Sequence, residues 1–191
     1  MEKPRFYILP GWGHRITDRN YRKLISIVSK KYLFTPLALS TRNRKYSLGG
    51  PEPVSTILKK IEEQIAKPCG RDVILGFSVG ALQAYLLARR LDFKHAILCS
   101  LSPVLGKDIL LYRKKELSDF SLVQRREMKK MNYPPLATKK VTLLYGGKEH
   151  ITVKNRAKRL SKRKGWRAIE IRNADHDLGD AYLKGIKKVL L

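Results

Sequence analysis

Short apolar runs, rich in β-branched and aromatic residues, alternate along the chain with stretches of helical periodicity. This order restricts the possible folds more than any other feature of the sequence. Most of the runs are nearly continuous in apolar residues, which is typical of strands that are covered on both faces of a sheet. The predicted strands are residues 5–9, 34–39, 73–77, 96–101, 141–145 and 168–171. The predicted helices are residues 17–31, 54–67, 78–90, 152–164 and 180–191.

Regular alternation of strands and helices predicts an α/β protein. We expect a three-layer sandwich in which about six mainly parallel strands are joined by right-handed crossovers and flanked by helices on both faces. The chain has 191 residues, of which 43% are apolar, enough for one hydrophobic core. It has no internal repeat and no interdomain linker, so residues 1–191 are predicted to form a single domain.

About forty residues between the fourth and fifth predicted strands interrupt the alternation. They contain a predicted helix at residues 119–131, which Pro134 and Pro135 would end. In α/β enzymes, a long insertion after the carboxyl end of a strand usually covers the active site. Residues 104–138, approximately, are therefore expected to form a small helical cap.

Gly76, Ser78 and Gly80 form the pattern Gly-x-Ser-x-Gly at the point where a predicted strand passes into a predicted helix. A sharp turn of this kind strains the backbone of the serine and needs small residues two positions before and after it. The helix amino terminus then directs its free N–H groups toward developing negative charge. The pattern predicts that Ser78 is a nucleophile. The alternative is a glycine-flanked turn in which Ser78 only caps the helix.

Three further segments, rich in glycine or charged residues, directly follow predicted strands. They are residues 9–14 (LPGWGH), 144–150 (LYGGKEH) and 173–178 (NADHDL). Together with the turn at Ser78, they resemble the corresponding loops of the α/β-hydrolase superfamily. This resemblance covers most of the chain.

The resemblance implies a catalytic triad in which Ser78 is the nucleophile, His176 the general base and Glu149 the acid that orients the histidine. The three follow the chain order serine, acid, histidine that this fold requires. Two alternatives are open for the acid. In the first, Glu149 is only a solvated loop residue. In the second, Asp175 or Asp177 supports the histidine instead of Glu149.

The resemblance also implies an oxyanion hole made by the backbone N–H groups of Trp12 and Val79. The sequence has Pro10 where histidine is common in the family, and we expect this change to be tolerated because the donors are backbone groups. The alternative for Trp12 is a core-packing aromatic residue.

Six strands, where the superfamily has eight, suggest that its first two antiparallel strands are absent. In this respect the chain resembles the short intracellular hydrolases related to the retinoblastoma-binding serine hydrolase, and other minimal esterases. The remaining histidines, His14, His95 and His150, do not have the chain order expected of the base.

These features predict a serine hydrolase that cleaves a carboxylic ester or thioester through an acyl-enzyme and uses no metal or cofactor. Gly11, Phe77 and Tyr112 are expected to line the substrate pocket. Two other classes stay open. One is a catalytically silent protein of the same fold that binds an anionic partner, and the other is an acyltransferase or a lyase on the same scaffold.

The formal net charge of +25 favours attraction to polyanions, acidic proteins and anionic surfaces. It is densest in residues 154–164, which contain seven basic residues and no acidic one. No recognisable nucleic-acid module accompanies them, so no specific nucleic-acid partner is predicted. An acidic carrier protein or another anion is the partner that the charge favours, and the alternative is a solvated surface without a partner.

The two cysteines, Cys69 and Cys99, are too few for a disulfide framework or a cysteine zinc site. Cys99 lies in an apolar run and is expected to be a buried thiol. No run of about 18 apolar residues is present, and the first residues lack the regions of a secretory signal. We therefore expect a cytoplasmic protein without a membrane span.

Overall fold

A computed structural model of the chain describes residues 2–37, 52–65, 68, 70–102, 104–111, 117, 120–133 and 136–190. Within these residues, strands and helices follow the predicted order. Along the chain they are β1 (Arg5–Leu9), α1 (Arg19–Val28), β2 (Leu33–Thr35), α2 (Val54–Gln64), β3 (Val73–Phe77), α3 (Val79–Leu87), β4 (His95–Cys99), the 3-10 helix η1 (Gly106–Leu111), α4 (Leu122–Lys130), β5 (Val141–Gly146), α5 (Ile151–Leu160), β6 (Trp166–Ile171) and α6 (Asp180–Leu190).

The six strands form one parallel sheet with the order β2-β1-β3-β4-β5-β6. The order of the strands reverses beside β1, which has β2 on one side and β3 on the other. In open α/β sheets, ligands bind in the crevice outside the carboxyl ends of the strands at such a reversal. Ser78 follows β3 at this position, and the predicted oxyanion loop follows β1.

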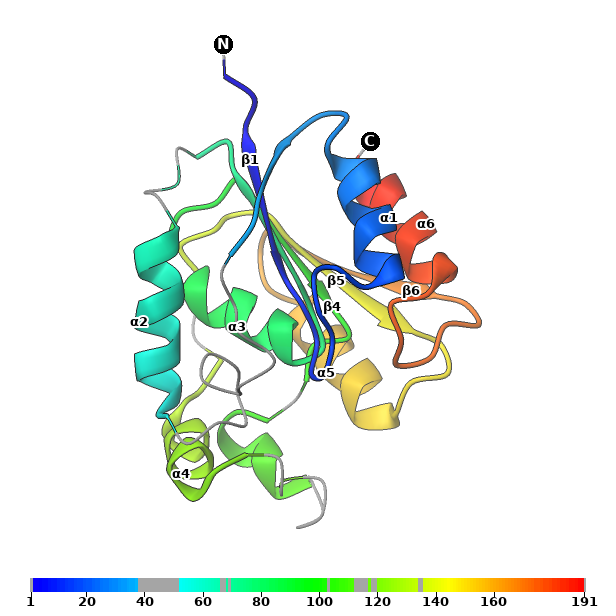
Figure 1. The fold of residues 1–191 in the computed structure, drawn as a ribbon. Coiled ribbons are helices and arrows are strands. Elements are labelled where there is room, and N and C mark those ends of the chain that lie inside the picture. Colours follow the sequence, from blue (N-terminus) through cyan, green and yellow to red (C-terminus); the bar gives the residue numbers. More distant parts are fainter. Residues whose placement is uncertain are drawn as a thin grey trace.

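Helices cover both faces of the sheet (Figure 1). On one face α1 and α6 lie side by side, and α2, α3 and α5 pack on the other. Successive residues of β3 supply the two layers, because Ile74 packs toward α3 whereas Val73 and Leu75 pack toward α1 and α6. The predicted three-layer sandwich is confirmed, and no antiparallel strand occurs in the described part of the chain.

Several predicted bounds differ from the observed ones. The second strand is Leu33–Thr35 instead of residues 34–39, of which 38 and 39 lie outside the described residues. β4 ends at Cys99 instead of residue 101, because Ser100 has a φ of 52° and leaves the extended conformation. α5 begins at Ile151 because the ring of His150 accepts a hydrogen bond from the backbone N–H of Thr152.

Within the predicted cap, α4 lies at the end of the sheet toward which β1 runs (Figure 1). Its residue Glu127 accepts hydrogen bonds from the Ser55 hydroxyl at 2.7 Å and from the backbone N–H of Val54. Pro53, which precedes α2, has no side chain that can cap the helix. Glu127 therefore satisfies the amino end of α2 and ties the insertion to it.

The other end of the insertion is tied to α5. Asp108 of η1 forms ion pairs with Arg156, which is buried, and with Arg159 at 3.1 Å. The Arg156 guanidinium in turn lies 4.1 Å from the centroid of the Tyr133 ring. Because Arg156 and Asp108 are both removed from water, loss of either partner would leave a buried charge without compensation.

His95 begins β4 at the amino edge of the sheet and is buried, with Nε2 2.8 Å from the Thr142 hydroxyl. Burial, together with the positive charges of Lys140, Arg167 and Lys94, lowers the pKa of His95 from 6.5 to about 3. Between these two values the unfolded chain binds a proton that the folded chain does not. The folded state therefore loses stability as the pH falls through this window.

Wild type should lose unfolding free energy between about pH 6.5 and pH 4. His95→Gln should lose less, since the variant has no imidazole at residue 95 to protonate. Urea denaturation at both pH values measures this change. His150→Gln removes an exposed histidine whose ring caps α5, and it should keep the pH dependence that His95 causes. The same pH dependence in wild type and His95→Gln would contradict the prediction.

Candidate active site

Ser78 lies between β3 and α3 with φ 55° and ψ −118°, a conformation that is uncommon for a residue with a side chain. Its backbone N–H donates to the carbonyl of Cys99 at 2.9 Å, which extends the pairing of β3 with β4 through the serine. A strained backbone conformation of this kind persists only where contacts with the surrounding structure hold it in place. The turn predicted from the sequence is therefore present, with Ser78 at the start of a buried helix.

Glycines on both sides of Ser78 are required by backbone contacts. A Cβ atom on Gly76 would lie 2.2 Å from the carbonyl oxygen of Gly80, and one on Gly80 would lie 2.1 Å from that of Leu9. Both obstacles are main-chain atoms, so no side chain can move to relieve them. The turn, α3 and the end of β1 consequently pack in direct backbone contact.

The three predicted triad residues lie in one hydrogen-bonded row. Ser78 Oγ is 2.8 Å from His176 Nε2, and His176 Nδ1 is 3.0 Å from Glu149 Oε1. The Glu149 carboxylate is buried, and its second oxygen accepts the backbone N–H of Gly146 at 2.8 Å. Removal from water and a fixed second oxygen hold the carboxylate toward the histidine.

The loops that carry Glu149 and His176 are joined by their own backbones. The N–H groups of Gly147 and Lys148 donate to the carbonyls of Ile171 and Ala174, each at 2.9 Å. Within the described residues, Glu149 is the only carboxylate at hydrogen-bond distance from His176 Nδ1. Asp175 and Asp177, the alternatives considered above, are exposed.

Ser100 is a site residue that the sequence did not single out. Its hydroxyl is fully buried, lies 2.7 Å from His176 Nδ1 and donates to Glu149 Oε1. Like Ser78, it directly follows a central strand and has a positive φ. A serine immediately after an apolar strand beside the nucleophile strand is the signal that sequence analysis could have used.

The predicted oxyanion loop lies against Ser78. A Cβ on Gly11 would be 3.4 Å from Ser78 Cβ, and the Gly11 N–H donates to the Tyr21 hydroxyl at 2.9 Å. Burial raises the pKa of Tyr21, so the hydroxyl stays protonated. Val79 is the first residue of α3, and its N–H therefore has no acceptor within the helix. Trp12 and Val79 thus belong to two segments that meet at Ser78.

The insertion reaches this loop through an aromatic contact. The rings of Trp12 and Phe120 lie with their centroids 6.4 Å apart, and Phe120 is buried. Trp12 is partly buried and packs against the core, as its alternative interpretation supposed. This contact is made by the ring, whereas the predicted oxyanion donor is the backbone N–H.

The predicted pocket residues have different surroundings. Phe77 is 1% exposed, and its ring lies 5.8 Å from the ring of His176 and 5.3 Å from that of Tyr182. It therefore packs in the core against the histidine, because residue 77 of β3 points to the same face as Val73 and Leu75, and its place in the substrate pocket stays a prediction. Gly11 lies beside Ser78, and Tyr112 lies outside the described residues.

Cys99 is fully buried. Burial, followed by the negative charge of Glu149, raises the pKa of Cys99 and keeps it a thiol. Cys69 lies outside the described residues. Across the described ranges, no group of three or more His, Cys, Asp or Glu side chains is arranged to hold a metal. No helix among the same residues combines the length and apolar character that crossing a membrane requires.

Comparison with known proteins gives structural matches only. No family model and no curated sequence matches the chain. Est1E from Butyrivibrio proteoclasticus, in a structure with ferulic acid bound, superposes with a TM-score of 0.76 at 13% identity over 99% of this chain and 87% of that chain. Alpha/beta hydrolase domain-containing protein 10 from mouse gives 0.72 at 14% identity over 100% and 90%. MGS-MChE2, an alpha/beta hydrolase enzyme from the metagenome of sediments of the lagoon of Mar Chica, Morocco, gives 0.71 at 16% identity over 99% and 89%.

Gly80→Ala is expected to destabilise the fold by about 1–3 kcal/mol or more, because its methyl group would overlap the Leu9 carbonyl. Chemical denaturation measures the loss. Gly179→Ala is the matched control, since a Cβ at Gly179 meets no atom within 4 Å. An unfolding free energy of Gly80→Ala within about 0.5 kcal/mol of that of the control would contradict the packing described for the turn.

Proposed function

We propose that this protein, which has the α/β-hydrolase fold, is a serine hydrolase that cleaves a carboxylic ester or thioester through an acyl-enzyme. The observation that carries the proposal is the row of hydrogen bonds from Ser78 through His176 to Glu149. A nucleophile, a base and an orienting acid at these distances form the arrangement that acyl transfer by serine needs.

In the first half of the reaction, Ser78 Oγ attacks the carbonyl carbon of the substrate while His176 Nε2 takes the hydroxyl proton. Glu149 keeps the Nδ1 proton on the far side of the ring and stabilises the positive charge of the imidazolium. When the tetrahedral intermediate collapses, the bond to the alcohol or thiol breaks. His176 gives that leaving group its proton, and the acyl group stays on Ser78.

In the second half, a water molecule attacks the acyl-enzyme and gives a proton to His176 Nε2. The bond between Ser78 Oγ and the carbonyl carbon then breaks, and the proton returns to the serine. A carboxylic acid leaves and the enzyme is restored.

The negative oxygen of both tetrahedral intermediates needs donors that are fixed beforehand. We assign this role to the backbone N–H groups of Trp12 and Val79. The contact of Gly11 with Ser78 and the position of Val79 at the amino end of α3 support this assignment. Removal of one such donor in known enzymes costs about 3 kcal/mol of transition-state stabilisation.

The substrate is proposed only at the level of its reacting group. Est1E holds ferulic acid, a carboxylic acid, in the structure to which this fold is similar. Release of a carboxylic acid is also the outcome of the mechanism above. The cap, whose Phe120 contacts Trp12, is proposed to bound the acyl side of the pocket. An acyltransferase would use the same residues, and product analysis with and without an acceptor alcohol separates the two.

A fluorophosphonate probe is expected to label the wild-type protein at Ser78 and to leave Ser78→Ala unlabelled, because only an activated serine reacts with it. Mass spectrometry of the labelled peptide identifies the residue. Ser161→Ala removes a surface hydroxyl and should label like wild type. Labelling of Ser78→Ala at any residue, including the neighbouring Ser102, would contradict the proposal.

We assign to Ser100 a positioning role, because its hydroxyl contacts both His176 Nδ1 and Glu149. Ser100→Ala and Ser100→Gly both remove this hydroxyl, but only glycine also relieves the positive φ. Each variant is expected to lower kcat about ten- to a hundredfold with little change in KM, as for loss of a hydrogen bond worth about 1.5–3 kcal/mol to a charged group.

Kinetics and denaturation of both variants separate the hydroxyl from the backbone. Ser100→Gly should be at least as stable as Ser100→Ala and equally impaired in kcat. Wild-type kcat in Ser100→Gly would assign the effect to the backbone and overturn the positioning role.

A further inference from the structure

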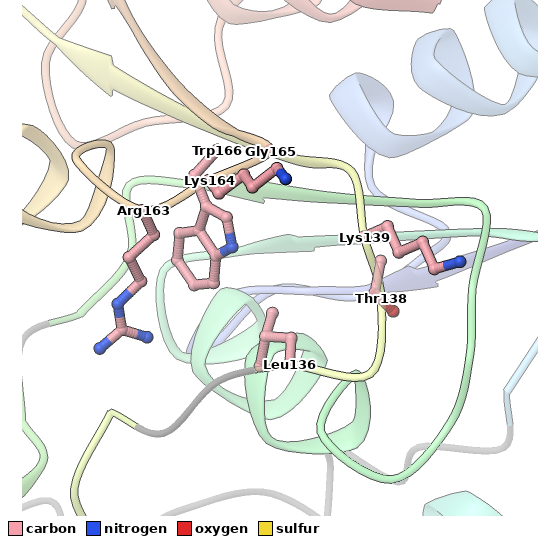
Figure 2. Close-up of a pocket in the computed structure, with 7 residues that line it drawn as sticks. All are labelled: Leu136, Thr138, Lys139, Arg163, Lys164, Gly165 and Trp166. Atoms are coloured by element: carbon pink, nitrogen blue, oxygen red, sulfur yellow. The ribbon is translucent and has the colours of Figure 1, made fainter.

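A hollow of about 650 Å³ opens beside the first residues of β6, at the amino edge of the sheet. Figure 2 shows the indole of Trp166 in this hollow, pointing toward Leu136, with Arg163 on one side and Lys139 on the other. The Arg163 guanidinium lies 5.1 Å from the centroid of the Trp166 ring. Lys139 and Lys164 are exposed. The hollow therefore combines apolar and aromatic walls with a cationic rim.

A second hollow of about 350 Å³ adjoins the first, because Arg163 lines both. It is lined by the aromatic residue Tyr133, whose carbonyl accepts a hydrogen bond from Arg163. Its acidic residue, Asp108, is held in an ion pair by Arg159 at 3.1 Å. Both volumes fall within the range of about 300–1,000 Å³ that small organic groups occupy in proteins.

Basic side chains predominate in the lining of the two hollows. Five of the lining residues are lysines or arginines and one is acidic: Lys107, Lys139, Arg159, Arg163 and Lys164, and Asp108. Lys94, Lys140 and Arg167 lie at the amino ends of three neighbouring strands, and all three are exposed. In the part of the chain that the structure describes, none of these three pairs with an acidic side chain. Their combined positive charge is one of the causes that lower the pKa of His95.

We propose that this surface binds single-stranded nucleic acid without sequence preference. Bases would enter the two hollows, and the phosphates would contact the lysines and arginines that separate and surround them. Sequence-independent single-strand binding uses this combination of a basic groove with aromatic side chains. The hollows share no residue with the triad, so the proposal is independent of the hydrolase proposal.

The hollows favour single strands over other polyanions. A base that is stacked within a duplex cannot enter a recess, whereas the unstacked bases of a single strand can. The carboxylates of an acidic protein would pair with the lysines but would place nothing flat and apolar against Trp166 and Leu136. A duplex and an acidic polypeptide are therefore the informative competitors.

Fluorescence anisotropy with a labelled single strand of about twenty nucleotides, titrated with protein between about 0.05 and 0.3 M salt, tests the proposal. We expect binding at about 0.15 M salt that is at least fivefold tighter for the single strand than for a duplex of the same length. Unlabelled single strand should compete better than poly-glutamate of equal charge. No binding at about 0.15 M salt, an equal or tighter affinity for the duplex, or equal competition by poly-glutamate would each overturn the proposal.

A charge-matched pair of variants locates the site. The double variant Lys139→Gln with Lys164→Gln should weaken single-strand binding about tenfold and reduce the salt slope by about 0.7 for each lysine removed. Lys184→Gln with Lys188→Gln removes the same charge from exposed positions of α6, on the other face of the sheet, and should leave the slope unchanged. Equal losses in both double variants would overturn the assignment to the hollows.

Removal of the Trp166 indole tests the proposed contact with a nucleic-acid base. Trp166→Leu is expected to weaken binding about tenfold with an unchanged salt slope, since a stacking contact and no charge is removed. Circular dichroism and thermal melting verify the fold of the variant. If Trp166→Leu does not fold, the quenching of tryptophan fluorescence on binding, compared between wild type and Trp166→Phe, reports the same contact. Undiminished binding by a folded Trp166→Leu, or equal quenching in wild type and Trp166→Phe, would overturn the proposal.

Discussion

The backbone contact between Gly80 and the carbonyl of Leu9 is the constraint on which the candidate site depends. It brings the start of α3 against the end of β1, and Gly76 lets the same helix start lie against β3. Once these main-chain segments touch, the Ser78 backbone is held at a positive φ and the loop at Gly11 lies beside it. A side chain at either glycine would separate Ser78 from its predicted oxyanion donors.

A second set of backbone contacts brings Glu149 and His176 to Ser78. The loops after β5 and β6 are joined by hydrogen bonds between Lys148 and Ala174 and between Gly147 and Ile171. A buried carboxylate is costly unless its oxygens are satisfied. Glu149 meets this requirement with one main-chain N–H, one histidine nitrogen and one hydroxyl.

The alternation of strands and helices, the two covered faces and the strand-end positions of Ser78, Glu149 and His176 could be predicted because each has a local signal in the sequence. Ser100 was missed: its place after an apolar strand is visible in the sequence, but its contacts depend on β4 lying between the strands that precede Ser78 and Glu149. Phe77 packs on the face covered by α1 and α6, as strand alternation from Leu75 directs, and its place in the substrate pocket stays a prediction. The end of β4 was misplaced because the positive φ of Ser100 leaves no compositional trace.

Two explanations for the large positive charge can be compared. In one it steers anionic substrates to the candidate active site, and in the other it forms a separate binding surface. β5 carries Lys140 just before its first residue and Glu149 three residues after its last one. Six residues of strand span about 20 Å, whereas charges in physiological salt are screened over about 8 Å. Cations at the amino edge therefore act only weakly on a substrate that approaches the carboxyl edge. Their concentration around the hollow at Trp166 is better explained by a ligand that binds there, at the opposite end of the strands from Ser78.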